Sequence, residues 1–169
     1  MRALREQAVG VARRHEPVLI VGEPGSGRTV VARYVHDLAG GQRPFVALVG
    51  AAIPEENAAA LLFGSIVNGE VQPGALEQAA GGTLYLRELQ DVAPTAQRLL
   101  AGALEQGSYV RVGQSAPVPL DVRVSASLAP DGAILKQGTR NEGAYEFFGQ
   151  VTIEDDRWCE DWRIVDFQK

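Results

Sequence analysis

A glycine-rich octapeptide between a short apolar run and a helix-forming segment constrains the fold of this chain more than any other feature. GEPGSGRT (Gly22–Thr29) has the spacing of the phosphate-binding loop GxxxxGK[ST], with arginine in place of lysine. The preceding run, Val18–Val21, is wholly apolar, as expected of a strand buried on both faces of a parallel sheet. The following segment, Thr29–Leu38, is predicted to be a helix that stops at Gly40 and Gly41. Strand, loop and helix in this order indicate a phosphate-loop fold.

The chemistry of such a loop depends on its glycines and on position 28. Glycines let backbone N–H groups converge on phosphate oxygens, and the N-terminus of the helix adds partial positive charge. A lysine would reach the β- and γ-phosphates, but arginine is bulkier and planar, so the exchange is not conservative. All basic residues but two are arginine, so Arg28 has an alternative origin: a lysine on a site no longer used could have been replaced through this bias. The candidate nucleotide-binding residues are Gly22, Glu23, Pro24, Gly25, Ser26, Gly27, Arg28 and Thr29, whose hydroxyl would hold Mg²⁺.

The rest of the chain alternates strands with helices, which predicts an α/β domain with a mostly parallel, five-stranded sheet between two helical layers. We expect an N-terminal helix within residues 1–16, an α/β domain over residues 17–153 and a divergent tail over residues 154–169. Further strands are expected at Phe45–Val49, Thr83–Leu86, Val122–Ser125 and Val151–Ile153, and a small hairpin at Tyr109–Val112 and Val118–Pro119. Further helices are expected at 2–15, Pro54–Phe63, Leu76–Ala80 and Pro94–Gln106, and loops at 64–74 and 131–143.

Composition and charge exclude several classes of function. The formal net charge is −5, which argues against a large electrostatic grip on nucleic acid or anionic lipid, so direct DNA binding is not expected. No apolar run is long enough for a membrane-spanning helix. The single cysteine, Cys159, excludes an internal disulfide and fits a reducing, cytoplasmic location. His15 and His36 form no metal-binding spacing with the scattered acids, and His36 is expected to pack in the core.

The tail differs from the rest of the chain in charge and in aromatic content. Residues 140–169 hold eight acidic and four basic side chains. Both tryptophans, Trp158 and Trp162, lie here with Phe167, and the alternation around Ile164 indicates a short amphipathic strand. These aromatics are expected either to fold back on the core or to form an interaction surface, since aromatic residues are enriched at binding hot spots.

With these elements in place, the chain resembles the AAA+ domain of the NtrC-type, sigma-54-dependent transcription activators, most nearly the NtrX-like branch. The matching stretches run in register from about Pro17 to Val124 and include VLIVGEPGSGRT, PFVAL, LLFG, GALEQAAGGTLYLRE and DVRV. The stretch Gly74–Glu88 is the most specific. The resemblance implies a domain that binds ATP, assembles into a ring and remodels sigma-54 RNA polymerase. It also leads us to expect that this chain, which stops near Lys169, lacks the family's helical lid and DNA-binding helices.

Departures from the family pattern predict a damaged ATPase site. The family's second acidic motif ends in Asp-Glu, but here it ends in Arg87-Glu88, so the glutamate that orients water remains and the metal-binding aspartate is lost. A like-charge pair 4 Å apart costs about 4 kcal/mol at an effective dielectric near 20, and a divalent ion facing an arginine is worse off. Mg²⁺ binding is therefore not expected. The alternative is that Arg87 has turned outward and pairs with a nearby acid.

Compared with the family that it resembles, the chain also lacks other characteristic residues. Val49 stands where an asparagine would partner the glutamate, and Leu128 and Ala129 stand where a Thr-Asn sensor pair is expected. The sigma-54-contacting GAFTGA loop has no counterpart within Ser65–Pro73, and the stretch that supplies arginine fingers corresponds to Asn141–Phe148, which holds no arginine. Removing one such part commonly costs about 10²–10³ in rate.

These losses predict a degenerate regulatory or interaction module in transcription control, with weak or no binding of ATP or ADP and a vestigial Glu88. Arg28 and Arg87 together could replace the metal's charge and give Mg²⁺-independent binding. A protein partner and homo-oligomers are expected. Two alternatives stay open: an active, ATP-binding fragment of a transcription activator, and a structural subunit that uses an empty loop scaffold.

Overall fold

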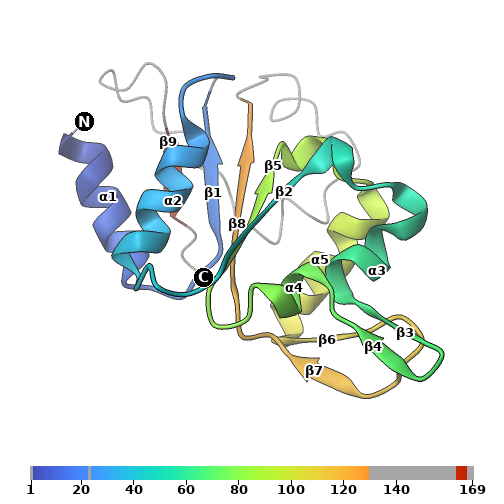
Figure 1. Ribbon diagram of the computed structural model, residues 1–169. Helices are drawn as coiled ribbons and strands as arrows, with labels where there is room; N and C mark the ends of the chain where they lie inside the picture. The colour runs from blue at the N-terminus through green and yellow to red at the C-terminus, as the bar shows by residue number, and fades with distance from the viewer. Residues whose placement is uncertain (1, 23, 130–162, 167–169) are drawn as a thin grey trace.

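The structure, a computed structural model, describes residues 2–22, 24–129 and 163–166 (Figure 1). The helices are α1 (Arg2–Ala12), α2 (Arg28–Leu38), α3 (Ala58–Phe63), α4 (Ala75–Gln78) and α5 (Pro94–Gln106), with short 3-10 turns η1 (Gly50–Ala52), η2 (Glu55–Asn57) and η3 (Leu89–Asp91). The strands are β1 (Val18–Val21), β2 (Phe45–Val49), β3 (Ser65–Val67), β4 (Glu70–Gln72), β5 (Thr83–Arg87), β6 (Ser108–Val110), β7 (Pro117–Pro119), β8 (Arg123–Leu128) and β9 (Arg163–Asp166).

Five strands form the central sheet in the order β2-β5-β8-β1-β9. The first four are parallel to their neighbours, whereas β9 pairs antiparallel with β1, placing Arg163 opposite Val21 and Asp166 opposite Val18. All residues of β1 and β8 and the first four of β5 are buried, because helices cover both faces of the sheet. The prediction of a mostly parallel α/β sheet is therefore confirmed, and its fifth strand is β9, in the segment expected to be a divergent tail.

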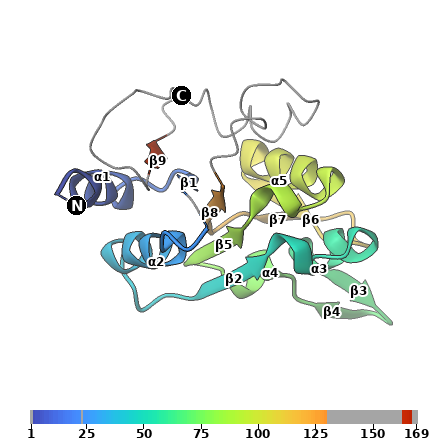
Figure 2. The same ribbon diagram turned by 90° about the horizontal axis from the view of Figure 1, so that it is seen from above.

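The sheet lies between two layers of helices, as the view from above shows (Figure 2). On one face, α1 and α2 pack against β1 and β5 through a cluster that includes Val11, Ile20, Val35 and Tyr85. On the other face, α3, α4 and α5 cover a larger cluster. Its fully buried side chains include Leu19, Leu62, Leu76, Leu84, Leu86 and Leu128. The division into two clusters follows from the alternation of side chains along each strand.

Most sequence-based element boundaries agree with the structure. The predicted bounds of β1, β2 and α5 are those observed, and the tail contains a strand at Arg163–Asp166. The expected loop at 64–74 is wrong in part, because β3 and β4 form an antiparallel hairpin there. The hairpin turns at Asn68 and Gly69, whose φ angles of 53° and 82° are those of a tight two-residue turn. The proposed strand at Val151–Ile153 lies outside the described residues.

The parallel strands give the sheet two chemically different edges. The carboxyl ends of β1, β5 and β8 meet at one edge, where Val21 runs into the glycine-rich loop and Arg87 into Glu88. The amino ends meet at the other edge, at Thr83 and Arg123. In open α/β sheets, ligands bind outside the carboxyl ends of the strands. The first edge is therefore where a nucleotide site is expected.

Candidate nucleotide-binding site

The glycine-rich loop has the backbone of a phosphate cradle. It leaves β1 at Gly22, whose N–H donates to the carbonyl oxygen of Leu128 at 3.2 Å. Gly25 and Gly27 have φ angles of 84° and 87°, a left-handed conformation that side chains other than glycine rarely adopt. Gly27 is the N-cap of α2, and its carbonyl accepts the N–H groups of Val30 and Val31 at 2.7 and 3.2 Å. The first turn of α2 therefore directs its free N–H groups toward the loop.

Arg28 is held by an ion pair across the site. It is the first residue of α2, and only 7% of its surface is exposed. Its guanidinium donates two hydrogen bonds to the carboxylate of Glu88, from Nη2 to Oε1 at 2.6 Å and from Nη1 to Oε2 at 3.1 Å. The side chain of Glu88 is 24% exposed. The flat, two-pronged contact uses the geometry that distinguishes arginine from lysine.

Glu88 occupies a constrained position directly after β5. Its φ and ψ angles of 54° and 62° lie in the left-handed region, which is uncommon for a residue with a side chain. Gln90 Nε2 also donates to Glu88 Oε2, at 2.8 Å. Burial is the largest single influence and raises the pKa of Glu88, but the hydrogen bonds from Gln90 and Arg28 and the charges of Arg28 and Arg87 together lower the pKa below its usual value. The carboxylate is therefore ionised at neutral pH.

Arg87 is exposed at the end of β5, next to Val49 of β2 in the sheet register. Its charge is nevertheless close enough to Glu88 to lower the pKa of that carboxyl. The ion pair with a nearby acid that one sequence-based alternative expected is not found among the described residues. Val49 is 38% exposed and Leu128 is fully buried at the end of β8, so neither position offers a polar group.

The described residues fit a phosphate group better than a magnesium ion. The positive φ angles, the helix N-terminus and a buried Ser26 hydroxyl without a hydrogen-bond partner suit phosphate oxygens. Mg²⁺ requires oxygen ligands, usually one or two carboxylates. Within the described ranges no three His, Cys, Asp or Glu side chains gather as metal ligands. Glu88, the carboxylate directly after β5, is already bound by Arg28. Among the described residues, the position directly after β5 therefore offers Mg²⁺ no free carboxylate.

Sequence reasoning placed most of the site but missed two of its features. The pairing of Arg28 with Glu88 joins residues 60 positions apart, and no local pattern indicates it. Gln90 lies in no motif, so its bond to Glu88 had no sequence signal. Of the other predicted residues, Gly22, Pro24, Gly25, Ser26, Gly27 and Thr29 lie on the described loop and the start of α2. Glu23, Trp158, Trp162 and Phe167 lie outside the described residues.

Fold and loop together define a phosphate-loop α/β domain, and comparison with known proteins places it more closely. Residues 1–151 match the family described as the Sigma-54 interaction domain. The chain is 39% identical over 136 residues to the response regulator protein FleR of Pseudomonas aeruginosa, covering 77% of this chain and 29% of the relative. It is 41% identical over 128 residues to the transcriptional regulator NtrC of a Bradyrhizobium species, covering 71% and 26%.

Solved structures agree with these relatives. NtrX from Brucella abortus in complex with ADP superimposes with a TM-score of 0.75 at 32% identity, over 86% of this chain and 33% of that chain. The same protein in complex with ATP gives a TM-score of 0.70 at 35% identity, over 79% and 30%. This chain belongs to the Sigma-54 interaction domain family of transcription activators. It spans less than a third of the length of the curated relatives FleR and NtrC. None of its described helices is long and apolar enough to cross a bilayer.

Proposed function

We propose that this chain is a non-hydrolysing member of its family, which binds nucleotide weakly or not at all and acts in transcription control through contacts with other proteins. The ion pair between Arg28 and Glu88 carries the proposal. It engages, in one contact, the residue at the lysine position of the phosphate loop and the glutamate that would orient water. Neither group is free for the role that the family resemblance assigns to it.

Nucleotide binding must compete with this pair. For Arg28 to reach a β- or γ-phosphate, its two bonds to Glu88 have to break, and the carboxylate must be left with Gln90 and solvent. A bidentate, charge-assisted contact is among the stronger polar interactions in proteins. NtrX binds both ADP and ATP, and the glycine geometry suits phosphate in this chain. We therefore propose that affinity is reduced by the cost of opening the pair.

Hydrolysis lacks its usual electrostatic support. Phosphoryl transfer depends on positioning and on positive charge supplied by lysine, arginine and Mg²⁺ around the transferred group. Here Arg87 puts a positive charge where a metal ligand is required, and Leu128 and Val49 are apolar. A phosphate group at the loop would meet Arg28 and Arg87 without an intervening metal. Any nucleotide binding is therefore proposed to be independent of Mg²⁺.

Steady-state phosphate release from ATP tests the absence of turnover. The purified chain is compared with Glu88→Gln, which removes the acidic group that the family resemblance assigns to orienting water, and with Glu56→Gln, an exposed glutamate of η2, as a matched control. The proposal expects equal, background rates in all three. Release above background that is lost in Glu88→Gln and kept in Glu56→Gln contradicts it.

A double variant that reverses both charge changes tests whether Arg28 and Arg87 cause the weak nucleotide binding. Arg87→Asp restores an acidic group after β5, and Arg28→Lys removes the fork that binds Glu88. The double variant is expected to gain Mg²⁺-dependent ATP binding by about tenfold or more over the parent, because two charge defects are reversed together. If calorimetry detects no gain in a double variant that unfolds as cooperatively as the parent, these two residues are not the cause of weak binding.

The proposed partners are proteins, with homo-oligomers as one form of assembly. The family relationship supports both, since the relatives are regulators of transcription. The β3–β4 hairpin occupies residues 65–72, where the resemblance would place the sigma-54-contacting loop. We therefore propose that contact with sigma-54 is weakened. Sedimentation of the chain with purified sigma-54 tests this point, and a complex at micromolar concentrations contradicts it.

A further inference from the structure

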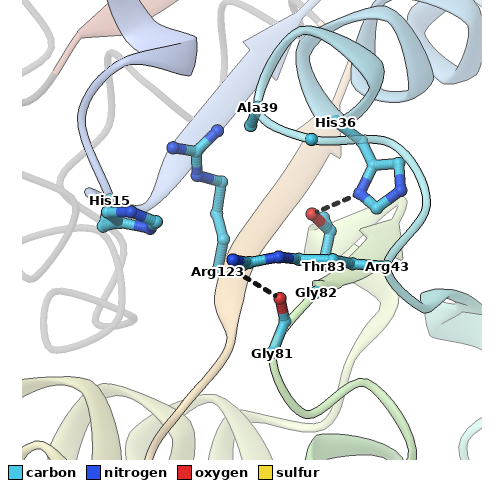
Figure 3. A pocket seen from close by; sticks show the side chains of 9 residues that line it. His15, His36, Ala39, Arg43, Gly81, Gly82, Thr83 and Arg123 are labelled. Carbon is cyan, nitrogen blue, oxygen red and sulfur yellow. Dashed lines mark hydrogen bonds between the residues drawn. The ribbon is translucent and has the colours of Figure 1, made fainter.

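A small pocket lies at the amino ends of the parallel strands, at the edge of the sheet opposite the glycine-rich loop (Figure 3). It is bounded by the start of β5 at Thr83, the start of β8 at Arg123, the last turn of α2 at His36, and the side chains of His15 and Arg43. The five steps between the six residues of β8 separate the two edges by about 17 Å at about 3.3 Å per residue. The pocket is therefore separate from the candidate nucleotide site.

Arg123 is the central group of this pocket. Only 5% of its surface is exposed. Nη2 donates to the carbonyl oxygen of Ala12 at 3.0 Å and also to that of Arg14, which ties β8 to the end of α1. Nε and Nη1 are buried and have no hydrogen-bond partner. Burial lowers the pKa of Arg123, because the charged form loses its hydration there.

A buried guanidinium of this kind calls for a negative partner. Removing a charge from water is costly unless it is paired and hydrogen-bonded. No described carboxylate forms an ion pair with Arg123 or lines the pocket. Two acids lie close by in the structure or the sequence: Asp121, whose Oδ2 is 4.0 Å from the Cβ position of Gly81, and Glu16, which follows His15 and has a buried Oε2 without a hydrogen-bond partner. The charge of Arg123 is thus satisfied by two backbone carbonyls alone among the described residues.

The other groups at this edge add positive charge and hydrogen-bonding capacity. Arg43 extends across the pocket, and its Nη1 donates to the carbonyl oxygen of Gly81 at 2.9 Å (Figure 3). Its remaining N–H groups are exposed. His15 lies on the other side of Arg123 in the same view. Thr83 Oγ1 and His36 Nδ1 are hydrogen-bonded at 2.9 Å. Two guanidiniums and two imidazoles therefore surround a space that no described acid enters.

Carbonyl groups limit what this pocket can accept. The last turn of α2 presents the negative end of its dipole here, although its carbonyls at Val35, His36 and Asp37 already accept N–H groups from residues 39–41. A large polyanion would meet the Gly81 carbonyl. Size and charge together favour a compact oxyanion.

We propose that the pocket is a binding site for a small oxyanion of the phosphate class. The anion accepts hydrogen bonds from the N–H groups of Arg43 that do not bind Gly81, and it is attracted by the charge of Arg123, whose Nε and Nη1 are themselves buried. The site is independent of the proposed loss of ATP hydrolysis, since it shares no residue with the glycine-rich loop. It gives the domain a second, metal-free phosphate contact at the opposite edge of the sheet.

Titration of the chain with inorganic phosphate, followed through the arginine Nε–H resonances by NMR, tests this inference. The Arg123 resonance is expected to shift and saturate, with no such change when chloride replaces phosphate at equal ionic strength. The Arg28 resonance reports binding at the glycine-rich loop separately. A linear drift of the Arg123 resonance, or the same response to chloride, overturns the proposal.

Two variants at exposed positions extend the test and leave the core unchanged. Arg43→Gln removes one exposed charge and is expected to weaken the Arg123 response about tenfold, the loss typical of one charge-assisted hydrogen bond, while leaving any Arg28 response unchanged. Arg98→Gln, an exposed arginine on α5 away from the pocket, is the matched control and should behave as the parent. Equal affinities in Arg43→Gln, Arg98→Gln and the parent overturn the proposal.

Discussion

Replacing Glu88 by glutamine tests how strongly the glycine-rich loop is tied to the end of β5. Arg28 keeps its charge in this variant, and at 7% exposure it cannot recover its lost partner from water. Removing one partner of a fully buried pair costs about 3–5 kcal/mol. Because Glu88 is 24% exposed and glutamine still accepts one hydrogen bond, we expect Glu88→Gln to lower the free energy of unfolding by about 2 kcal/mol.

The reciprocal change should cost less. Arg28→Met leaves Glu88 with the hydrogen bond from Gln90 and with partial solvation, so we expect a loss of about 1 kcal/mol. Urea denaturation of both variants, the double variant and the exposed control Glu56→Gln gives the coupling energy of the pair. If the free energy of unfolding of Glu88→Gln lies within about 0.5 kcal/mol of the parent value, as for a surface ion pair, the assignment of a strong, partly buried contact is refuted.

Three further outcomes follow from the same region. Because the folded-state pKa of Glu88 is lowered, the carboxylate stabilises the fold fully above its unfolded-state pKa, and this effect is lost as the pH falls through the folded-state pKa. We therefore expect the free energy of unfolding of Glu88→Gln to depend less on acid than that of the parent. Unfolding measured across about pH 3–6, the range of the usual carboxyl pKa, checks this. Gly50→Ala places a Cβ against the carbonyl oxygen of Glu88 and the backbone of Val92. We expect thermal unfolding to show a free energy of unfolding lower by about 2 kcal/mol, and a decrease below about 0.5 kcal/mol would show that the turn adapts. Gln97→Leu removes the buried donor to the carbonyls of Leu89 and Val92, at 3.0 and 2.7 Å, and should cost about 1–3 kcal/mol by urea denaturation; an unchanged midpoint would mean that water replaces the amide.

The sheet was predictable because its strands are buried on both faces. A strand such as Val18–Val21 has to be a continuous apolar run, and the run also sets its length. The β3–β4 hairpin was missed for the opposite reason. Its strands have three residues each and are largely exposed, so the pattern of apolar residues says little, although Asn68–Gly69 is a strong turn signal.

The candidate site also has parts that the sequence predicted and parts that it did not. The glycine-rich loop was found from local spacing, because a phosphate loop requires specific residues at fixed positions. Arg87 and Glu88 were found through the family resemblance. What the arginine at position 28 does was not predictable, since it depends on Glu88, which the chain brings next to it only through the pairing of β1, β8 and β5. Arg123 gave no signal beyond its place in the DVRV motif, because its burial depends on α1.

Calorimetric titration of the chain with ATP, in Mg²⁺ and again in EDTA, tests the central claim most directly. Directly after β5, the ion pair of Glu88 with Arg28, with Arg87 beside it, leaves no free carboxylate to hold a divalent ion next to a triphosphate. The account predicts weak or undetectable binding that is the same in both buffers. Binding that strengthens about tenfold or more in Mg²⁺ contradicts it, because the metal would then have found ligands that this arrangement does not offer.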